Sequence, residues 1–536
     1  MTVPQLWYTA AGPALLVAVG MVPGRNGTRA AAARTLLAIA AAAVTLVCAL
    51  STAVAVIALG AVRTAPLGVS GLSFGIYVDA TSAMMFVLVA FIGLIVVIYS
   101  RNYLDGDSRH LRFVRWLCLT LAAVLLVILS GNLVLFALAW IATSLALHRL
   151  LIFYPERQAA LLAARKKYLA SRLGDLCLLA AMACLYRGFG SLEYADLFRM
   201  AARFTPGTSP WFVHAAAILL VCTALLKSAQ LPLHGWLIEV METPTPVSAL
   251  LHAGIINAGG FLVLRFADLI SLSTPALYSL ALIGGMTAVF GSVVMLTQTS
   301  IKVSLAYSTI AQMGFMMLEC GLGAFSAALL HILAHSLYKA HAFLSSGSVI
   351  DIARASWTPS PGGQPHPARL AISIVAVMGV TIVVGSAFGA TLVEKPGIFA
   401  LGAVVVLSLI HLVANGIDER PNAFVIGRTV ISAVVVAFGY FGLQYLMELV
   451  VANSLPATQR VRGPFDVVLV TAIILSFGAL TMFQSLLPRQ AAQSRWQGLY
   501  AHVSNGFYLN TLANRWVLRF WPTPPARAAS VSEGGQ

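Results

Sequence analysis

Long runs of apolar residues, separated by short polar segments, follow one another along almost the whole chain. A helix needs about 20 consecutive apolar residues to cross the hydrocarbon core of a bilayer, and most of these runs reach that length. The pattern therefore predicts an all-α polytopic membrane protein with about thirteen or fourteen transmembrane helices. The runs cover residues 8–22, 33–62, 78–99, 112–130, 132–153, 169–187, 211–230, 245–268, 276–297, 300–321, 324–350, 370–391, 397–416, 424–451 and 466–487.

Three segments outside these runs have a different character. Residues 356–367 are rich in Pro and Gly, which is typical of an exposed linker. Residues 494–521 mix aromatic and basic side chains and are too polar to span, so they favour an interfacial or partner-binding helix. We interpret Pro522 onward as a disordered tail.

The composition agrees with a membrane protein. Of the 536 residues, 59% are hydrophobic and 10% are charged, whereas soluble domains carry about 25% charged residues. The net charge of +15 is explained by Lys and Arg that anchor cytoplasmic loops, so nucleic acid is not an expected partner. The six cysteines lie within or beside apolar runs without CxxC spacing, which favours packed thiols over disulfides or metal ligands.

Positive charge alternates from loop to loop. The loops around Arg25 and from 101 to 115 are basic, whereas residues 62–76 hold only Arg63. By the positive-inside rule the odd-numbered loops are cytoplasmic, which predicts a multi-pass protein of the cell inner membrane with a periplasmic N-terminus. We interpret the strongest cluster as part of the loop after the fifth run; it consists of Arg157, Arg165, Lys166, Lys167 and Arg172.

The segment from Leu226 to Phe266 connects two apolar runs, yet it holds titratable residues. Lys at the bilayer centre costs roughly 2.5 to 3.5 kcal/mol, so Lys227 is expected to face a wet or protein-lined interior. Pro232 should break the helix shortly afterwards, and two further prolines interrupt the chain again. Because unwound backbone at membrane depth is tolerated only inside protein or beside a cavity, a broken helix near residues 227–246 indicates an ion path.

Five motifs surround this segment. They are Arg172-Leu-Gly-Asp175, Lys-Ser-Ala-Gln-Leu-Pro-Leu at 227–233, Pro-Thr-Pro-Val-Ser-Ala-Leu-Leu-His-Ala at 244–253, the segment from Ile301 to Gly314, and the segment from His331 to Val349. Together they resemble the proton-translocating antiporter-like membrane subunits of respiratory complex I and the Mrp antiporters. The resemblance covers most of residues 75–350 and implies two inverted repeats, with ion sites at broken helices.

From this resemblance we divide the chain into five parts. They are N-terminal transmembrane helices in 1–110, a first antiporter-like repeat in 111–268, a second and degenerate repeat in 269–452, a last transmembrane helix in 453–493, and an interfacial or partner-binding tail in 494–536. The second repeat lacks a plain lysine-bearing broken helix. Its candidate is Lys395, which is equally explained as a helix-end charge that reaches the membrane surface.

Lys227 is the first candidate for carrying a proton. Burial favours the neutral form of a lysine, whereas a nearby carboxylate favours the charged form, so the two forms can be close in free energy. Asp175 is the candidate carboxylate; the alternative is an ion pair with Arg172 at a helix end. His252 titrates near physiological pH and opens the second half of the interrupted segment. Its alternative is a hydrogen-bonded packing histidine.

His331, His335 and Lys339 are spaced i, i+4 and i+8, so they form one stripe on a helix face. A polar stripe on an apolar helix indicates a wet line across the membrane. The histidine pair could bind zinc, but it lacks the glutamate of the HExxH signature and a third ligand, so we expect no metal site in this chain.

Lys302 is a further candidate for the ion path, and four other residues are secondary candidates. Lys302 either extends the line toward the second half or anchors a helix end, and Asp79 matches the family pattern toward one mouth of the path. Glu239 and Glu242 could belong to the path, although a loop-exposed role is favoured. Lys395 completes the set.

One position departs from the family pattern. In the complex I relatives, a glutamate after a tryptophan pairs with the broken-helix lysine. Here Ile141 follows Trp140, so that ion pair cannot form, and His148 further along the helix is the candidate replacement. The segments 140–151, 252–260 and 502–510 resemble the DabB branch, the membrane subunits of the DAB inorganic-carbon accumulation complex.

The resemblance implies a partner for this chain, a DabA-like cytoplasmic zinc protein similar to β-carbonic anhydrases. Cation flow would drive the hydration of CO2 to bicarbonate in that partner. The chain would then be an ion-translocating subunit without a cofactor and not an enzyme by itself, and Lys and His favour H+ over Na+. Two alternatives remain: a proton-pumping subunit of an NADH-quinone oxidoreductase-like or Mrp-type complex, and a passive membrane scaffold.

Overall fold

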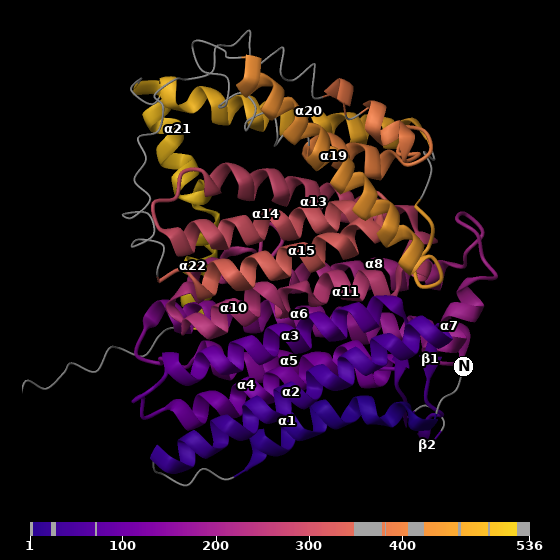
Figure 1. Cartoon of the computed structure of the whole chain (residues 1–536), viewed down its shortest axis with the longest axis vertical. Coiled ribbons are helices and arrows are strands. Elements are labelled where there is room, and N and C mark those ends of the chain that lie inside the picture. Colours follow the sequence, from indigo (N-terminus) through magenta and orange to yellow (C-terminus); the bar gives the residue numbers. More distant parts are fainter. Residues whose placement is uncertain are drawn as a thin grey trace, which may run out of the picture.

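Long helices lie side by side through most of the structure (Figure 1). The computed structural model describes residues 4–22, 28–69, 72–347, 378–380, 382–405, 423–458, 463–490 and 494–521. Within these ranges nine helices are long and apolar enough to cross a membrane, which confirms the prediction of an all-α polytopic membrane protein. The predicted linker 356–367 and the tail from Pro522 lie outside the described residues, as do parts of the runs at 370–391 and 397–416.

The longest helices match the predicted spans closely, because lipid and protein interior both favour apolar helices with satisfied backbones. They are α2 (Thr28–Leu59), α3 (Ala80–Tyr103), α4 (His110–Leu129), α5 (Leu133–Leu151), α6 (Gln158–Phe189), α13 (Thr274–Met295), α14 (Ile301–Gly321), α15 (Phe325–Leu344), α19 (Ala423–Val451) and α20 (Pro464–Gln490).

Shorter elements connect or end these helices. They are η1 (Pro4–Ala10), α1 (Ala11–Met21), α7 (Tyr194–Ala201), α8 (Trp211–Lys227), α9 (Gly235–Glu239), η2 (Val240–Glu242), α10 (Thr245–Ala253), η3 (Ile255–Asn257), α11 (Ala258–Arg265), α12 (Ala267–Ser271), α21 (Ser494–Ser504), η4 (Gly506–Tyr508) and α22 (Leu509–Phe520). Two small antiparallel ladders lie between α2 and α3: β1 (Val62–Arg63) pairs with β4 (Tyr77–Val78), and β2 (Leu67–Val69) pairs with β3 (Leu72–Phe74).

The helix break predicted near 227–246 is confirmed. α8 ends at Lys227, the short α9 follows after a turn, and α10 begins only at Thr245. A second break was not predicted: the run at 245–268 is divided at Gly254 into α10, η3 and α11. Hydropathy cannot reveal this break, because the residues on both sides of it are equally apolar and buried.

The interpretation of the basic cluster as part of a loop was wrong. α6 begins at Gln158 and continues to Phe189, so four of the five basic residues are helical. Lys166 and Lys167 are only 8% and 3% exposed. A charged stretch resembles a loop in sequence, but here these side chains find polar partners inside the protein.

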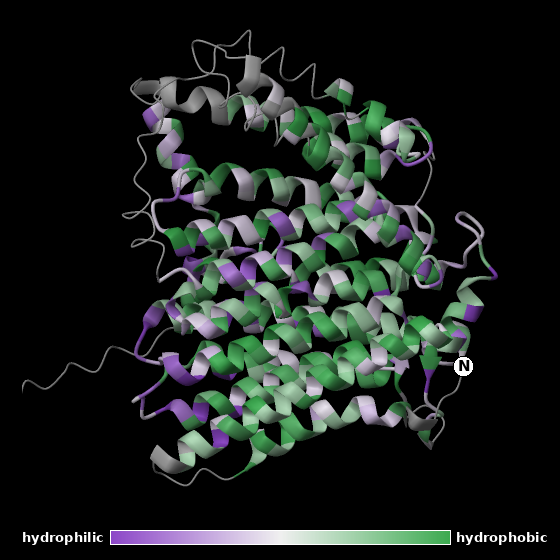
Figure 2. Cartoon of the chain, in the orientation of Figure 1, coloured by the Kyte–Doolittle hydropathy of each residue, from purple (hydrophilic) through white to green (hydrophobic). Residues whose placement is uncertain are grey.

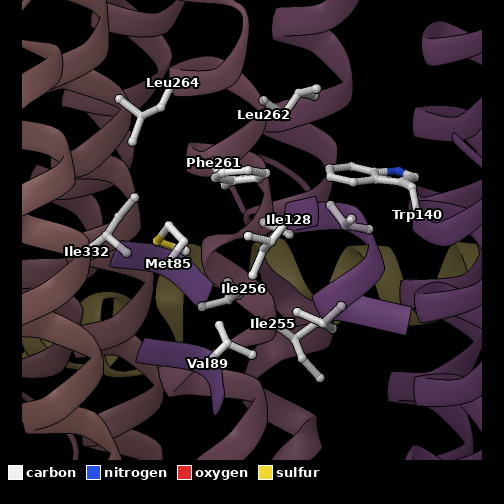
Figure 3. Packing of buried hydrophobic residues seen from close by; sticks show 14 of the residues in the cluster. Met85, Val89, Ile128, Trp140, Ile255, Ile256, Phe261, Leu262, Leu264 and Ile332 are labelled. Atoms are coloured by element: carbon white, nitrogen blue, oxygen red, sulfur yellow. The ribbon is translucent and has the colours of Figure 1, made fainter. Parts of the chain in front are cut away.

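Most of the buried apolar residues of the described chain are gathered in one large cluster, which lies mainly in the helices from α1 to α15. Figure 3 shows part of it beside the broken segment, with the rings of Trp140 and Phe261 and the aliphatic side chains of Ile255 and Ile256. Figure 2 shows the exception: polar residues also occur inside the bundle, on α14 and α15, as well as at the helix ends. These interior polar residues belong to the site described next.

Candidate ion pathway

Lys227 lies at the last residue of α8 and is buried. Its Nζ is 4.4 Å from the centroid of the Trp140 ring and 3.5 Å from Ser144 Oγ, both on α5. Among the described residues no carboxylate oxygen lies within 4.0 Å of this ammonium. The ion pair that Ile141 was predicted to remove is therefore replaced by an aromatic face and a hydroxyl group.

Lys167 is a second buried lysine that sequence reasoning missed. Its Nζ donates to the backbone oxygen of Ser144 at 2.9 Å and to Ser144 Oγ at 3.1 Å. Ser144 therefore contacts both ammonium groups and links α6 to the end of α8. In a low-dielectric interior each of two like charges disfavours the charged form of the other, so the arrangement suits proton exchange.

Asp175 forms an ion pair with Arg172, with Arg172 Nη2 and Asp175 Oδ2 2.6 Å apart on α6. The ion pair with Arg172, the alternative raised from the sequence, is thus observed, although it lies within α6 and not at a helix end, and Asp175 is not in contact with Lys227. Its negative charge still attracts Lys227 and Lys167 electrostatically. Asp175 therefore stabilises the positive charges of this region at a distance.

His252 lies on α10 and is fully buried. Its Nδ1 is 2.9 Å from Thr309 Oγ1, and its ring stacks on Phe343 with centroids 4.4 Å apart. Thr309 Oγ1 donates its only hydrogen to Leu305 O at 3.0 Å, so His252 Nδ1 must be the donor to Thr309. Within the described residues His252 Nε2 has no hydrogen-bond partner, so it remains a proton acceptor.

The stripe of His331, His335 and Lys339 lies on one helix, α15, which packs against α10. Lys339 is fully buried, and its Nζ donates to Leu305 O at 3.1 Å. That same oxygen accepts from Thr309, which connects Lys339 to His252. The rings of His331 and His335 have centroids 6.0 Å apart, so the stripe continues along the helix.

Glu319 on α14 is a further member that sequence reasoning missed. Its Oε2 is 3.0 Å from His331 Nδ1, and both side chains are largely buried. Both residues line a cavity of 640 Å³ between α13–α15 and the described parts of the chain from Val404 onward. A single glutamate inside the apolar run at 300–321 was the signal that could have identified it.

Two small cavities flank Lys227. One is bordered by Trp140, Thr143 and Gly254, and the other by Lys167 and Leu251, among others. Each has a volume of 10 Å³, close to the smallest space that holds one water molecule. They connect Lys227 to the break between α10 and α11, at Gly254 and Ile255.

Glu239 is not exposed in a loop, so the favoured interpretation of this residue was wrong. It lies in α9, and its Oε2 is 2.7 Å from Lys166 Nζ. Asn510 and Asn514 of α22 donate to Glu239 Oε1 at 2.9 and 2.7 Å. Contacts between residues so distant in sequence have no local sequence signal.

The remaining candidates lie at the edges of the bundle. Glu242 is exposed, as predicted, but it is the last residue of η2 and not a loop residue, and it pairs with Arg157 at 3.4 Å. Lys302 Nζ donates to Thr245 Oγ1 at 3.3 Å at the start of α14, and the ring of His148 lies 5.5 Å from that of Tyr168.

Asp79 and Lys395 each have an ionic partner. Asp79 caps α3 through Ser82 and pairs with Arg265 at 2.8 Å, with both side chains buried. Lys395 Nζ lies 2.6 Å from Glu448 Oε2. Neither residue is in contact with the buried line from Lys167 to Glu319. In the part of the chain that the structure describes, no group of three or more His, Cys, Asp or Glu side chains could hold a metal ion.

Two protein-family models match the chain. The model described as "NADH:quinone oxidoreductase/Mrp antiporter, TM" matches residues 130–357, and the one described as "NADH-Ubiquinone oxidoreductase (complex I), chain 5 N-terminus" matches residues 66–114. All the buried titratable residues of the line described above lie within the first of these ranges.

Individual proteins are similar over most of the chain. The "probable inorganic carbon transporter subunit DabB2" of Halothiobacillus neapolitanus is 40% identical over 472 residues, which cover 87% of this chain and 84% of that protein. The "probable inorganic carbon transporter subunit DabB" of Hydrogenovibrio crunogenus is 38% identical over 463 residues, which cover 85% of each. In a solved structure of the Mrp complex from Dietzia, one chain aligns with a TM-score of 0.62 and 21% identity, over 96% of this chain and 59% of that one.

Proposed function

This chain belongs to the DabB-type family of inorganic carbon transporter subunits, within the antiporter-like membrane proteins, and on that premise we propose that it translocates protons to drive an inorganic carbon pump. The buried line of titratable residues carries this proposal. It consists of Lys167, Lys227, His252, Lys339, His335, His331 and Glu319, with the hydroxyl groups of Ser144 and Thr309 as links within its two parts. Among the described residues no hydrogen bond joins Lys227 to His252, and a small cavity beside Lys227 extends to Gly254. Lysine and histidine bind and release protons, whereas Na+ would be held by oxygen ligands.

The family resemblance supplies the rest of the proposal. A DabA-like cytoplasmic zinc protein would hydrate CO2 to bicarbonate, and this chain would supply the free energy. Hydration releases a proton, and one charge that crosses 100 mV supplies about 2.3 kcal/mol. Because about 1.4 kcal/mol corresponds to a tenfold change in an equilibrium, this is enough to drive hydration well past equilibrium.

The coupling is tested by bicarbonate accumulation in bacterial cells that express the chain together with its zinc partner. We expect accumulation to require both proteins and to stop when a protonophore collapses the proton gradient. Accumulation that continues in the presence of the protonophore would contradict the coupling. The protein alone is expected to show no CO2 hydration activity.

A second candidate function is that of a proton-pumping subunit in an NADH-quinone oxidoreductase-like or Mrp-type complex. Its support is the match of residues 130–357 to the family model shared by those complexes. Purification from the native membrane in mild detergent separates the two functions. A zinc protein as stoichiometric partner supports the carbon pump, and quinone-reductase or antiporter subunits support the alternative.

The proposed location is the inner membrane, with the N-terminus in the periplasm. Arg109 and Glu156 form an ion pair at 3.2 Å, so the loops that follow α3 and α5 share one side, which the basic residues make cytoplasmic. The ladder between α2 and α3 lies near the start of α5, because Gly131 N donates to Gly75 O at 2.8 Å. This ladder would then face the periplasm.

Thiol labelling tests this topology. Leu67 is 58% exposed and the Glu156 side chain is 56% exposed, so Leu67→Cys and Glu156→Cys form a matched pair. A membrane-impermeant maleimide added to spheroplasts is expected to label Leu67→Cys and to label Glu156→Cys only after lysis. The reverse pattern would require an inverted orientation.

Glu319 should contribute to proton flow through its contact with His331. Glu319→Gln keeps the shape but removes the charge, and we expect the rate of proton flux in proteoliposomes to fall about tenfold, within the range of single hydrogen bonds to charged groups. Glu242→Gln, at an exposed ion pair, is the control and should leave the flux unchanged. Equal fluxes for the two variants would exclude Glu319 from the path.

A further inference from the structure

The C-terminal helix α22 contributes two side chains to a partly buried polar cluster at one end of the bundle. Asn510 and Asn514 are one helical turn apart, and each accepts from Lys166 Nζ through its carbonyl oxygen, at 2.7 and 2.5 Å. Each also donates through its amide nitrogen to Glu239 Oε1. The ammonium and the carboxylate are therefore held by α22 as well as by each other.

The turn that precedes α22 has an unusual backbone conformation. The φ values are 57° for Gly506, 50° for Phe507 and 60° for Tyr508. Residues other than glycine rarely adopt a positive φ. Such a turn persists only where the surrounding structure fixes it. Figure 1 shows the C-terminal segment running along one end of the bundle, across the helix ends.

Gly235, the first residue of α9, leaves the space that Asn510 occupies. A Cβ atom at position 235 would lie 2.0 Å from Asn510 Oδ1, and no ordinary contact is that short. The observed position of the Asn510 side chain therefore depends on a glycine at position 235.

Lys166 is adjacent in α6 to Lys167, which belongs to the buried line. The ammonium of Lys167 contacts Ser144 inside the bundle, while that of Lys166 contacts Glu239, whose side chain is 13% exposed. The cluster is thus partly accessible to solution through Glu239 and is linked to the end of the line by the adjacent positions of Lys166 and Lys167 in α6. An acid and a base are in contact in this cluster, and the acid is accessible to water. This is the composition expected where protons enter or leave a path, which we call its mouth.

We propose that Lys166 and Glu239 form the mouth at which protons are exchanged with the solution, and that Asn510 and Asn514 of α22 are the positioning residues that hold this pair. This inference rests on the proposed proton pathway. The proton moves from Lys166 Nζ to the Glu239 carboxylate, 2.7 Å away, and from there to water, which leaves a neutral amine and then restores the carboxylate. The reverse sequence returns it.

The first test replaces both asparagines by leucine, which keeps their size but removes all four hydrogen bonds. The expected result for Asn510→Leu/Asn514→Leu is a loss of about tenfold in proton flux in proteoliposomes, typical of lost hydrogen bonds to charged groups. The control is Asn505→Leu, because the side chain of Asn505, just after the end of α21, donates only to Ala501 O among the described residues. This control should keep the wild-type rate.

The second test changes α9, which Asn510 contacts, and not α22. Gly235→Ala leaves both asparagines intact but displaces Asn510, so it should lower the flux in the same way. Gly498→Ala is the matched control, since a Cβ atom there meets nothing within 4 Å. Wild-type flux in either the double leucine variant or Gly235→Ala would overturn the inference.

A double-mutant cycle separates positioning from a general structural effect. If the asparagines act through the ion pair, their replacement should have no further effect once Lys166→Met and Glu239→Gln have removed it. An additive loss would instead overturn the positioning role.

A wild-type rate in Lys227→Ala would reject the proton pathway itself, whereas a loss in Lys227→Ala with normal flux in the asparagine variant would reject only this inference.

Discussion

Lys227→Ala is expected to abolish proton flux and carbon accumulation while the protein still folds and assembles. Lys227 is the point at which the Lys167–Ser144 contact meets the break between α10 and α11, so its removal interrupts the line. Loss of a positioned proton-transfer group typically costs about a hundredfold or more in rate. Proteoliposome flux gives the rate, and gel filtration with thermal unfolding reports assembly.

Lys227→Arg is the matched variant for this prediction. Arginine keeps the positive charge over the Trp140 ring, but it does not release its proton in proteins. We therefore expect Lys227→Arg to be as inactive as Lys227→Ala. Full flux in the arginine variant would show that the charge alone matters and would reject proton exchange at this site. Normal activity in both variants would favour the passive scaffold.

Arg265→Met is expected to produce the largest loss of stability among single substitutions at the candidate residues. Arg265 pairs with Asp79 at 2.8 Å, and its guanidinium group lies over the rings of Tyr77 and Tyr194. Both charged side chains are almost inaccessible, so removing one leaves the other buried and unpaired. Such a change typically costs about 3–5 kcal/mol in the free energy of unfolding, measured as a lower unfolding temperature in detergent.

The double variant Asp79→Asn/Arg265→Met is the control for that stability prediction. Because it leaves no unpaired charge, we expect it to recover much of the lost stability. Flux per folded molecule should remain close to the wild-type value in both variants, since Asp79 caps α3 and does not contact the buried line. A variant that is folded but inactive would return Asp79 to the ion path.

The positions of most membrane-length helices could be predicted from the sequence. Apolar runs of the right length have few alternatives in a bilayer, because every backbone donor and acceptor must be satisfied within the segment. The prolines after Lys227 likewise predict the break, since proline removes a donor wherever it stands. The same local logic failed at residues 158–167, where a charged stretch continues as the helix α6.

The residues of the candidate line were identified in part by their chemistry alone. Lys227, His252 and the stripe from His331 to Lys339 are titratable groups in apolar surroundings, which is a local property of the sequence. Their partners could not be identified in this way. Lys227 meets Trp140 and Ser144 and not Asp175, and His252 meets Thr309.

The sequence by itself therefore determined that this protein is a helical membrane protein with a broken, lysine-bearing segment. The tertiary structure alone decided which titratable groups meet, including the contact of Lys166 and Glu239 with the C-terminal helix α22. The physical reason is that hydropathy depends on the residues within one helix. A contact between side chains depends on the rotation and approach of two helices, which are set by packing across the whole bundle.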